Sequence, residues 1–267
     1  MKIVLTGSSS GIGRFLSDTL AAKGHEVCGL ARSPHDGEGF SCDVSDWNSV
    51  QDCAGGIAAK WGAVDALVCC AGMQEPIGPA MEMEPLAWQR NLAVNLDGTF
   101  FAIRAFYPLL RKSSRRAKVV CFSGGGAANP RPNFAAYGVA KAGVVRLVET
   151  LAAEWGSEPP DINAVAPGAI FTRMTEQVLA CGAAIAGDGE FANASRLSTD
   201  NSAKLEKVLG LVEMLLSEQG DGISGRLISA PWDPWRNFPA LRAELMQTDI
   251  FTLRRIVPED RGKKWQP

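Results

Sequence analysis

A phenol and an ammonium group stand four residues apart in the stretch Tyr137-Gly138-Val139-Ala140-Lys141. In a helix, both side chains would lie on one face, one turn apart. A free tyrosine has a pKa of about 10, too high for a base at neutral pH, and a neighbouring cation lowers that value by stabilising the phenolate. Such a pair could exchange a proton with an alcohol or a carbonyl oxygen. Taken alone, the same spacing is also typical of an ordinary helix surface.

A glycine-rich turn follows the first apolar run of the chain, and a helical pattern follows the turn. Gly7 permits a tight turn, Gly11 lets the backbone approach a pyrophosphate, and Gly13 lets the helix pack closely on the strand. The helix N-terminus would add free N–H groups and a positive dipole end. A merely flexible turn is the alternative. The cofactor contacts expected here are Gly7, Ser9, Ser10, Gly11, Ile12 and Gly13.

The second apolar run ends in Leu30-Ala31-Arg32. A carboxylate that holds both ribose hydroxyls of NAD is expected about twenty residues after the turn, and Ala31 occupies about that position. Arg32 could pair with a ribose 2′-phosphate, so we expect NADP(H) to be favoured. A solvated arginine is the alternative, and Asp36 and Glu38 lie close enough to keep NAD(H) in view.

Short apolar runs that alternate with helical patterns would position these groups. Most of the runs are apolar on both faces, as in strands of a parallel sheet that is covered on both sides. The pattern predicts a Rossmann-type, doubly wound α/β fold with about seven strands. The expected strands are Lys2–Thr6, Glu26–Ala31, Phe40–Cys42, Ala66–Cys70, Lys118–Ser123, Ile162–Ala166 and Arg226–Ser229. The expected helices are Gly11–Lys23, Ser45–Trp61, Leu86–Lys112, Phe134–Trp155 and Ala203–Ser217.

Composition narrows the functional classes. Of the 267 residues, 21% are charged, and the net charge of −2 carries no block of one sign, so neither a nucleic-acid nor a membrane partner is expected. His25 and His35 are the only histidines, and the seven cysteines show no metal spacing, so we expect no metal site. The chain opens without room for a signal segment, and we expect a reducing, cytoplasmic location.

With these motifs in view, the chain resembles the short-chain dehydrogenase/reductase family over nearly all of residues 1–230. Four further stretches occur in the family's order. The resemblance implies that Asp43 and Val44 contact the adenine ring. It further implies that Cys69-Cys70-Ala71-Gly72 corresponds to an Asn-Asn-Ala-Gly element that steadies the central sheet, with Ala71 and Gly72 binding the cofactor. It also implies that Asn95 holds a proton-relay water. In the stretch Pro167-Gly168-Ala169-Ile170-Phe171-Thr172, the resemblance implies that Ile170 and Thr172 bind the carboxamide.

The resemblance also implies a catalytic serine after the fifth strand, which would donate to the substrate oxygen. Ser123 is the serine within reach, but it lies 14 residues before Tyr137, since 137 − 123 = 14. The family's serine usually sits one residue closer, at the position of Gly124. Either the glycine loop shifts the register so that Ser123 serves, or another group donates. We expect Ser123 to serve; a serine that bonds the backbone at the strand end is the alternative.

We expect one domain over residues 1–267. The least regular part, residues 172–201, would form a lid over the substrate. Residues 231–267 continue past the usual end of relatives and contain Trp232, Trp235 and Trp265. This extension would cover the pocket or, as we favour, pack on a neighbouring subunit. By resemblance, pairing of the two long helices would give a homodimer or homotetramer.

The catalytic set expected is Asn95, Ser123, Tyr137 and Lys141, with Tyr137 and Lys141 also touching the cofactor. The expected reaction moves a hydride between NADP(H) and a secondary alcohol or ketone, with a carbohydrate-like substrate as a hypothesis. A sugar epimerase or dehydratase would need a different glycine spacing and a C-terminal substrate domain. A non-catalytic NAD(P)-binding sensor, or an NAD-dependent dehydrogenase of the same family, remains an alternative.

Overall fold

The computed structural model describes residues 1–33 and 39–265, so Asp36 and Glu38 lie outside the described residues. The described residues form a seven-stranded sheet with the order β3-β2-β1-β4-β5-β6-β7, and every neighbouring pair is parallel. This arrangement confirms the doubly wound fold. The strands are β1 (Lys2–Thr6), β2 (Glu26–Ala31), β3 (Phe40–Ser41), β4 (Ala66–Cys69), β5 (Lys118–Phe122), β6 (Asp161–Ala166) and β7 (Leu227–Ser229).

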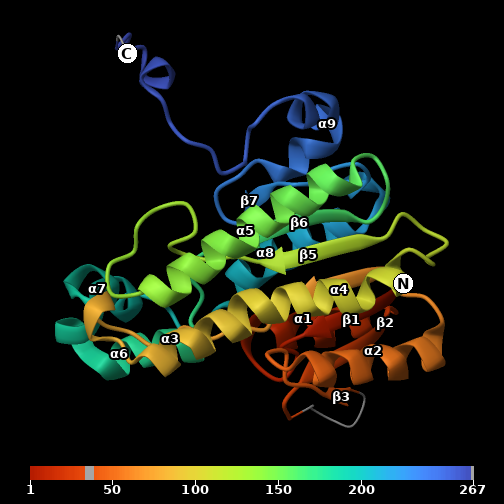
Figure 1. Cartoon of the computed structure of the whole chain (residues 1–267), viewed down its shortest axis with the longest axis horizontal. Helices are drawn as coiled ribbons and strands as arrows, with labels where there is room; N and C mark the ends of the chain where they lie inside the picture. Colours follow the sequence, from red (N-terminus) through yellow and green to blue (C-terminus); the bar gives the residue numbers. More distant parts are fainter. Residues whose placement is uncertain (34–38, 266–267) are drawn as a thin grey trace.

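Helices cover both faces of the sheet (Figure 1). One core lies under α2 (Trp47–Trp61), α4 (Gly98–Leu110) and α5 (Ala135–Trp155). The other core lies under α1 (Gly11–Ala22) and α8 (Ser202–Leu216). Because side chains alternate along a strand, neighbours such as Cys121 and Phe122 on β5 enter opposite cores. Central strands must therefore be apolar on both faces, which explains why they were readable in the sequence.

The long helix expected over residues 86–112 is divided into three parts. These are α3 (Pro85–Leu92), a single π-helical turn (Ala93–Asp97) and α4. A π-turn adds one residue to the helix and frequently lies at a functional site. Here it contains Asn95, one of the expected catalytic residues.

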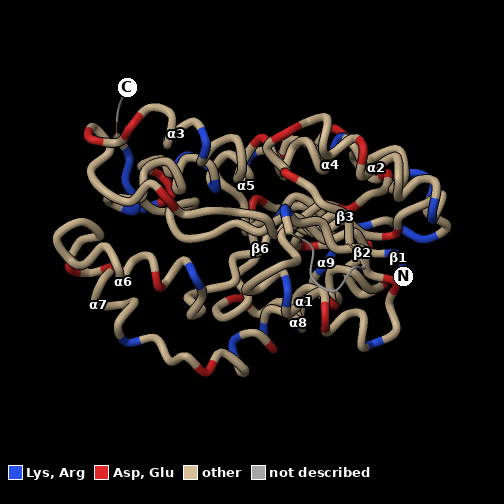
Figure 2. The backbone as a smooth tube through the Cα atoms, turned by 90° about the horizontal axis from the view of Figure 1, so that it is seen from below, with Lys and Arg blue, Asp and Glu red and all other residues tan. Residues whose placement is uncertain are grey.

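The segment expected to be the least regular is helical, so that interpretation was wrong. Residues 172–201, which we call the lid segment, form α6 (Arg173–Ala186) and α7 (Asp188–Ser195). Gly182 and Gly187 have positive φ values of 75° and 91°, which kink α6 and separate it from α7. The glycines suggested a loop, but the alanine-rich stretches between them favour helix. Both helices project at the end of the molecule away from the N-terminus (Figures 1 and 2).

The C-terminal extension packs on its own chain before it leaves the body of the molecule (Figure 1). It contains α9 (Phe238–Gln247), and just before this helix Trp235 is buried and donates its indole N–H to the Ala230 carbonyl at 3.0 Å. Further on, the Leu227 amide of β7 donates to the Phe251 carbonyl at 2.8 Å. Trp232 and Trp265, by contrast, are exposed. One of the three tryptophans therefore serves packing within the chain.

No helix among residues 1–33 and 39–265 is both long and apolar enough to cross a bilayer. Acidic and basic residues are mixed along the backbone (Figure 2).

Candidate active site

The site lies at the carboxyl ends of β1 and β4, where the strand order reverses direction. Open α/β sheets bind their ligands in the crevice at such a point. The Thr6 hydroxyl accepts hydrogen bonds from the amides of Cys70 and Ala71, both at 3.2 Å, and so joins the two strand ends. A Cβ atom on Gly7 would lie 2.7 Å from the Ala71 backbone, so only glycine fits this close approach. The turn and the segment after β4 therefore form one wall.

The start of α1 fits a dinucleotide phosphate. Its N-cap residue, Ser10, makes no side-chain cap bond, which leaves the first amides of the helix available to an anion. A Cβ on Gly13 would lie 2.2 Å from the Gly7 carbonyl oxygen, so the helix packs on the turn only because Gly13 has no side chain. At Gly11 the added atom would meet only the Thr172 methyl group, at 3.7 Å. The turn and the loop after β6 thus face each other across the space beside α1.

Tyr137 and Lys141 occupy the first turns of α5, as their spacing predicts, and both are buried. The Lys141 Nζ lies 5.7 Å from the centre of the Tyr137 ring and donates to the Phe122 carbonyl at 2.9 Å. A Cβ on Gly72 would lie 3.5 Å from that Nζ and 2.8 Å from the Asn95 Oδ1. The structure therefore brings Tyr137, Lys141, Gly72 and Asn95 to one place, beside the glycine turn.

The electrostatics of the pair differ from the expectation. Burial raises the pKa of Tyr137 to about 12, and the positive charge that opposes this rise belongs to Arg131. Burial also lowers the pKa of Lys141 to about 8. Desolvation of the phenol outweighs the effect of the Arg131 charge, because low-dielectric surroundings penalise the charged form. In the ligand-free protein the pKa of Tyr137 is therefore not lowered, and the effect of Lys141 in the presence of a bound cofactor stays a prediction.

The three-glycine loop places Gly124, and not a serine, against the phenol. A Cβ on Gly124 would lie 2.3 Å from the Tyr137 hydroxyl, so a side chain at this position would displace it. Ser123 continues the sheet ladder, since its amide donates to the Val165 carbonyl at 2.9 Å. By alternation its side chain lies on the α5 side of the sheet, like that of Cys121. The Ser123 Oγ is buried and has no hydrogen-bond partner among the described residues.

Asn95 is fully buried, and its side chain is bonded within the protein. Its Nδ2 donates to the Met73 carbonyl at 2.7 Å and to the Asn91 Oδ1 at 3.0 Å, while its Oδ1 accepts from the Met73 amide at 3.2 Å. Asn91 in turn donates to the Glu75 carbonyl at 2.7 Å. The two asparagines fix the segment after β4 to the π-turn. The Asn95 side chain thus acts as a structural clamp.

The loop after β6 is held at both ends. Ile170 is buried, and Thr172 caps α6 together with Thr175. The side chain of Asn201 accepts from the Phe171 amide at 2.9 Å and donates to the Phe171 carbonyl at 2.6 Å. At the other end of the loop, a Cβ on Gly168 would lie 2.8 Å from Pro231, so the loop rests on the start of the C-terminal extension, next to Pro167. The loop that faces Gly11 is therefore rigidly supported.

The residues expected at the adenosine end follow β2 and β3. Arg32 comes directly after the last residue of β2 and is exposed. Asp43 accepts from the Ser45 amide at 2.9 Å and from the Ser45 hydroxyl at 2.6 Å, and these hydrogen bonds hold the pKa of its carboxyl below its usual value. Val44 is buried and lies against Gly98.

A polar network at the rim of the site escaped the sequence analysis. Arg131, in the loop between β5 and α5, pairs through two hydrogen bonds with Glu190 of α7 and donates to Gln74 at 3.2 Å. Gln74 donates to the Met174 carbonyl of α6 at 3.1 Å. No periodicity marks these residues, because each lies in a different loop or helix. The one signal in the sequence is that Arg131 is a charged residue six positions before Tyr137.

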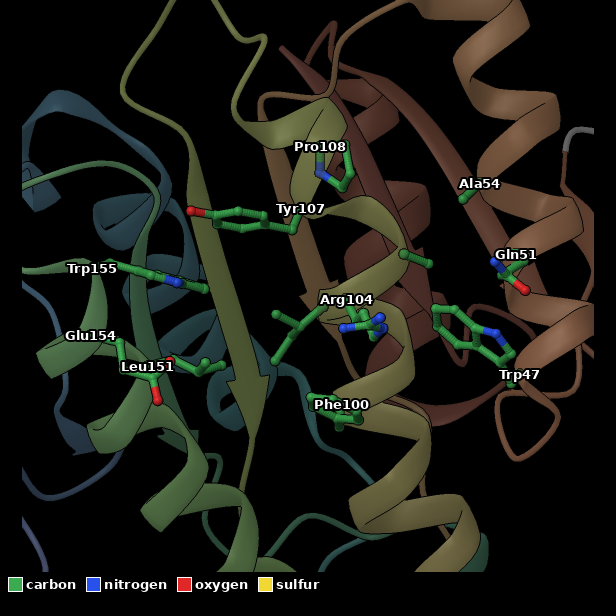
Figure 3. Close-up of a pocket in the computed structure, with 12 residues that line it drawn as sticks. Trp47, Gln51, Ala54, Phe100, Arg104, Tyr107, Pro108, Leu151, Glu154 and Trp155 are labelled. Atoms are coloured by element: carbon green, nitrogen blue, oxygen red, sulfur yellow. The ribbon is translucent and has the colours of Figure 1, made fainter.

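The described residues also line a surface hollow of about 630 Å³ between α2, α4 and α5 (Figure 3). Its walls include Trp47, Phe100, Tyr107 and Trp155. Neither Tyr137 nor Lys141 lines it, so this hollow is separate from the catalytic pair.

The sheet order and the glycine turn define a fold of the dinucleotide-binding α/β class. A family model described as short chain dehydrogenase matches residues 1–181, and the chain belongs to that family. The resemblance seen in the sequence is thereby confirmed, as is activity on CH–OH or carbonyl groups.

Individual relatives differ in what they are named for. D-threitol dehydrogenase of Mycolicibacterium smegmatis is 31% identical over 64% of this chain and 70% of its own length. The 3-oxoacyl-acyl-carrier-protein reductase of Escherichia coli K12 is 28% identical over 84% of this chain and 93% of its own. The ligand-free structure of Thermoplasma acidophilum aldohexose dehydrogenase superposes with a TM-score of 0.73, at 23% identity over 85% of this chain and 91% of its own.

Proposed function

We propose that the protein is an NADP(H)-preferring reductase or dehydrogenase that acts on a secondary alcohol or ketone, with Tyr137 as the general acid or base. The observation that carries this proposal is the position of the Tyr137 hydroxyl. It lies against Gly124, and Lys141, one helical turn further along α5, lies near Gly72 in the segment that packs on the glycine turn. A proton donor thus stands next to a site suited to a dinucleotide.

The cofactor contacts follow from the walls of the crevice. The backbone of Gly7, Ser9, Ser10, Gly11, Ile12 and Gly13 would hold the pyrophosphate, and the rigid loop from Pro167 to Thr172 would hold the carboxamide through Ile170 and Thr172. Asp43, Val44, Ala71 and Gly72 would line the adenosine half and the floor. When bound, the nicotinamide ring gives or accepts the hydride and, in its oxidised form, adds a positive charge.

Proton transfer belongs to the protein's own residues. Tyr137 would donate its proton to a developing alkoxide during reduction or remove one from the alcohol during oxidation. Lys141 would bind the nicotinamide ribose and add positive charge. Ser123, whose buried hydroxyl has no partner in the described residues, would donate to the substrate oxygen. Asn95 keeps the segment after β4 in place, and its proton-relay role stays a prediction.

The preference for NADP(H) rests on Arg32. Its position after β2, with Ala31 where NAD-binding proteins carry a carboxylate, favours a 2′-phosphate. NAD(H) is the alternative, because the carboxylates of Asp36 and Glu38 follow Arg32 closely in the sequence.

For the substrate we propose a small polyol or sugar-like ketone, bound beneath the lid segment. Similarity to a relative named for D-threitol supports this class. The rim of the site also supports this class, because Arg131, Glu190 and Gln74 are hydrogen-bonding groups. The formal charges of Arg131 and Glu190 cancel each other.

A direct test is turnover by the purified chain with NADP⁺ or NAD⁺ and a panel of polyols, sugars, aliphatic alcohols and steroids. We expect reduced cofactor to form with NADP⁺ and a polyol, and Tyr137→Phe to remove turnover while cofactor still binds. If aliphatic ketones and steroids outperform every sugar derivative, the substrate class is wrong. Cofactor binding without turnover on any compound would instead identify a sensor.

We further propose that two copies associate through the hollow between α2, α4 and α5 (Figure 3). Its aromatic side chains, Trp47, Phe100, Tyr107 and Trp155, are the kind of residues enriched in protein interfaces. A homodimer or homotetramer in light scattering would support this, and a monomer at micromolar concentration would refute it.

The seven cysteines are unpaired, which supports a reducing, cytoplasmic location.

A further inference from the structure

The guanidinium of Arg131 is a second cation near the Tyr137 ring, besides the ammonium of Lys141. Its central carbon lies 6.0 Å from the centre of the Tyr137 ring and 3.7 Å from that of Phe134. Three of its N–H groups are directed by partners, two by Glu190 at 2.7 and 2.9 Å and one by Gln74 at 3.2 Å. Such a planar, two-pronged pairing holds the charge in one place.

The glycine loop makes room for this arginine. A Cβ on Gly125 would lie 3.6 Å from the Arg131 Cδ, and one on Gly126 would lie 3.4 Å from its Cβ. The loop that brings Gly124 to the phenol therefore also accommodates Arg131.

Glu190 ties this arrangement to the lid segment. It lies in the first turn of α7, and α6 and α7 pack on the ring of Phe134 through a small core that includes Val178, Ala186 and Ala194. The Glu190 side chain is 31% exposed and that of Arg131 17%, so the pair stands at the rim and is only partly screened by water. Because Glu190 belongs to α7, a movement of α7 away from the loop before α5 would separate the carboxylate from the guanidinium.

The charged and titratable groups that face Tyr137 are few. Lys141 comes from its own helix, Cys70 from the end of β4, and Arg131 from the loop before α5, with Glu190 behind it. Burial raises the pKa of Tyr137, Arg131 opposes that rise, and Cys70 adds to it. Glu190 must weaken the field of Arg131, because opposite charges at 2.7 Å largely cancel at a distance.

We propose that Arg131 is a positioning residue that favours the ionised form of Tyr137, and that Glu190 on the lid segment sets how strongly it does so. This inference rests on the proposed role of Tyr137 but concerns a different pair of residues. The position of the lid segment would then influence the pKa of the Tyr137 hydroxyl.

The composition of the chain offers a readout that needs no turnover. Tyr107 and Tyr137 are the only tyrosines, and Tyr107 stacks on Trp155 away from the site. In a Tyr107→Phe background, the NMR signal of isotope-labelled tyrosine therefore reports on Tyr137 alone. We would compare the fraction of phenolate at one alkaline pH at which every variant remains folded, and the pH profile of alcohol oxidation where turnover is found.

The two partners must have opposite effects. Glu190→Gln leaves the cation unneutralised and should lower the Tyr137 pKa by roughly half a unit to one unit, while Arg131→Met should raise it by a similar amount. Arg131→Lys keeps the charge and should restore most of the phenolate. Glu213→Gln, which breaks the surface pair with Lys23 at 2.5 Å, serves as the matched control and should change nothing.

Shifts in the same direction for Glu190→Gln and Arg131→Met, or no shift in either, would overturn the proposal, since loss of a structural ion pair predicts that result. If Arg131→Met fails to fold, Glu190→Gln and Arg131→Lys still decide the direction. Absence of turnover in the parent protein would refute the proposed function and leave the NMR comparison valid.

Discussion

At the scale of single residues, the absence of a Cβ atom at position 124 decides where the Tyr137 hydroxyl can lie. Gly124 leaves room for the Tyr137 hydroxyl, which would lie 2.3 Å from any Cβ placed there. The hydroxyl of Ser123, one residue earlier, is buried without a partner in the described part of the chain. A buried polar group with no partner costs about 1–3 kcal/mol, so a site that retains one gains from a ligand that supplies the partner.

Ser123→Ala should therefore reduce kcat by about a hundredfold, the usual effect of removing one donor to a reacting oxygen. Near-normal turnover would remove Ser123 from the mechanism. The double variant Ser123→Ala/Gly124→Ser moves the hydroxyl to the position usual in the family, and here it should be inactive because its Cβ displaces Tyr137. Recovery of activity in that variant would contradict the register described above.

Arg32 can be tested through cofactor choice. Loss of one charge-assisted contact to a phosphate costs about 1.5–3 kcal/mol, so Arg32→Ala should raise KM for NADP⁺ by about ten- to a hundredfold. The KM for NAD⁺, which lacks the 2′-phosphate, should change little. If initial-rate assays show equal changes in the KM for NADP⁺ and the KM for NAD⁺, Arg32 does not recognise the 2′-phosphate.

At the scale of secondary-structure elements, the sequence predicted what depends on local pattern. The seven strands and five helical stretches are recognisable because buried parallel strands are continuous apolar runs. The cofactor turn and the Tyr137–Lys141 pair follow from fixed spacing along one strand or helix. The π-turn at Asn95 and the helices α6 and α7 were missed, since extra residues in a helix and tertiary packing leave no periodic signal. Arg131, Glu190 and Gln74 meet only in three dimensions.

The two asparagines beside the π-turn provide a test at this scale. Asn91→Ala removes the donor to the Glu75 carbonyl and an acceptor for Asn95, and should lower the free energy of unfolding by about 1–3 kcal/mol. Activity should fall as well, because the segment after β4 is no longer fixed. Denaturant unfolding measures the first effect. Asn193→Ala on the exposed face of α7 is the control and should stay within about 0.5 kcal/mol of the parent.

At the scale of the whole molecule, the two ends of the sheet have different roles. The carboxyl end carries the site, while the opposite end is closed by a buried charge cluster. Asp161 accepts from Arg116 at 2.7 Å, from Lys118 at 2.8 Å and from the Gly222 amide at 2.9 Å, and Lys118 also pairs with Asp221 at 2.6 Å. These contacts join the starts of β5 and β6 to the segment before β7.

Because of this cluster, we expect the free energy of unfolding to depend on pH in the acid range. Burial raises the pKa of Asp161, but the hydrogen bonds from Arg116 and Lys118 outweigh it, so the folded pKa lies below the usual value. A depressed carboxyl pKa contributes stability above the unfolded value of about 4, and this contribution is lost as pH falls through the folded pKa.

Asp161→Asn should therefore cost about 3–5 kcal/mol near neutral pH, because it leaves Lys118 buried with a weaker partner. It should also flatten the loss of stability below about pH 4. Urea unfolding at several pH values measures both effects. If the free energy of unfolding of Asp161→Asn falls with acid as steeply as that of the parent protein, other carboxyl groups control this pH dependence.

The hydrogen bond from Leu227 to Phe251 has a consequence for handling the protein. β7 is the last strand of the sheet, and the extension occupies part of its free side, aided by the Arg226 side chain, which donates to the carbonyls of Thr248 and Ile250. An unprotected outer strand invites pairing with other chains and aggregation. A chain shortened at residue 247 would uncover that strand, so an affinity tag is better added after residue 267 than substituted for the last twenty residues.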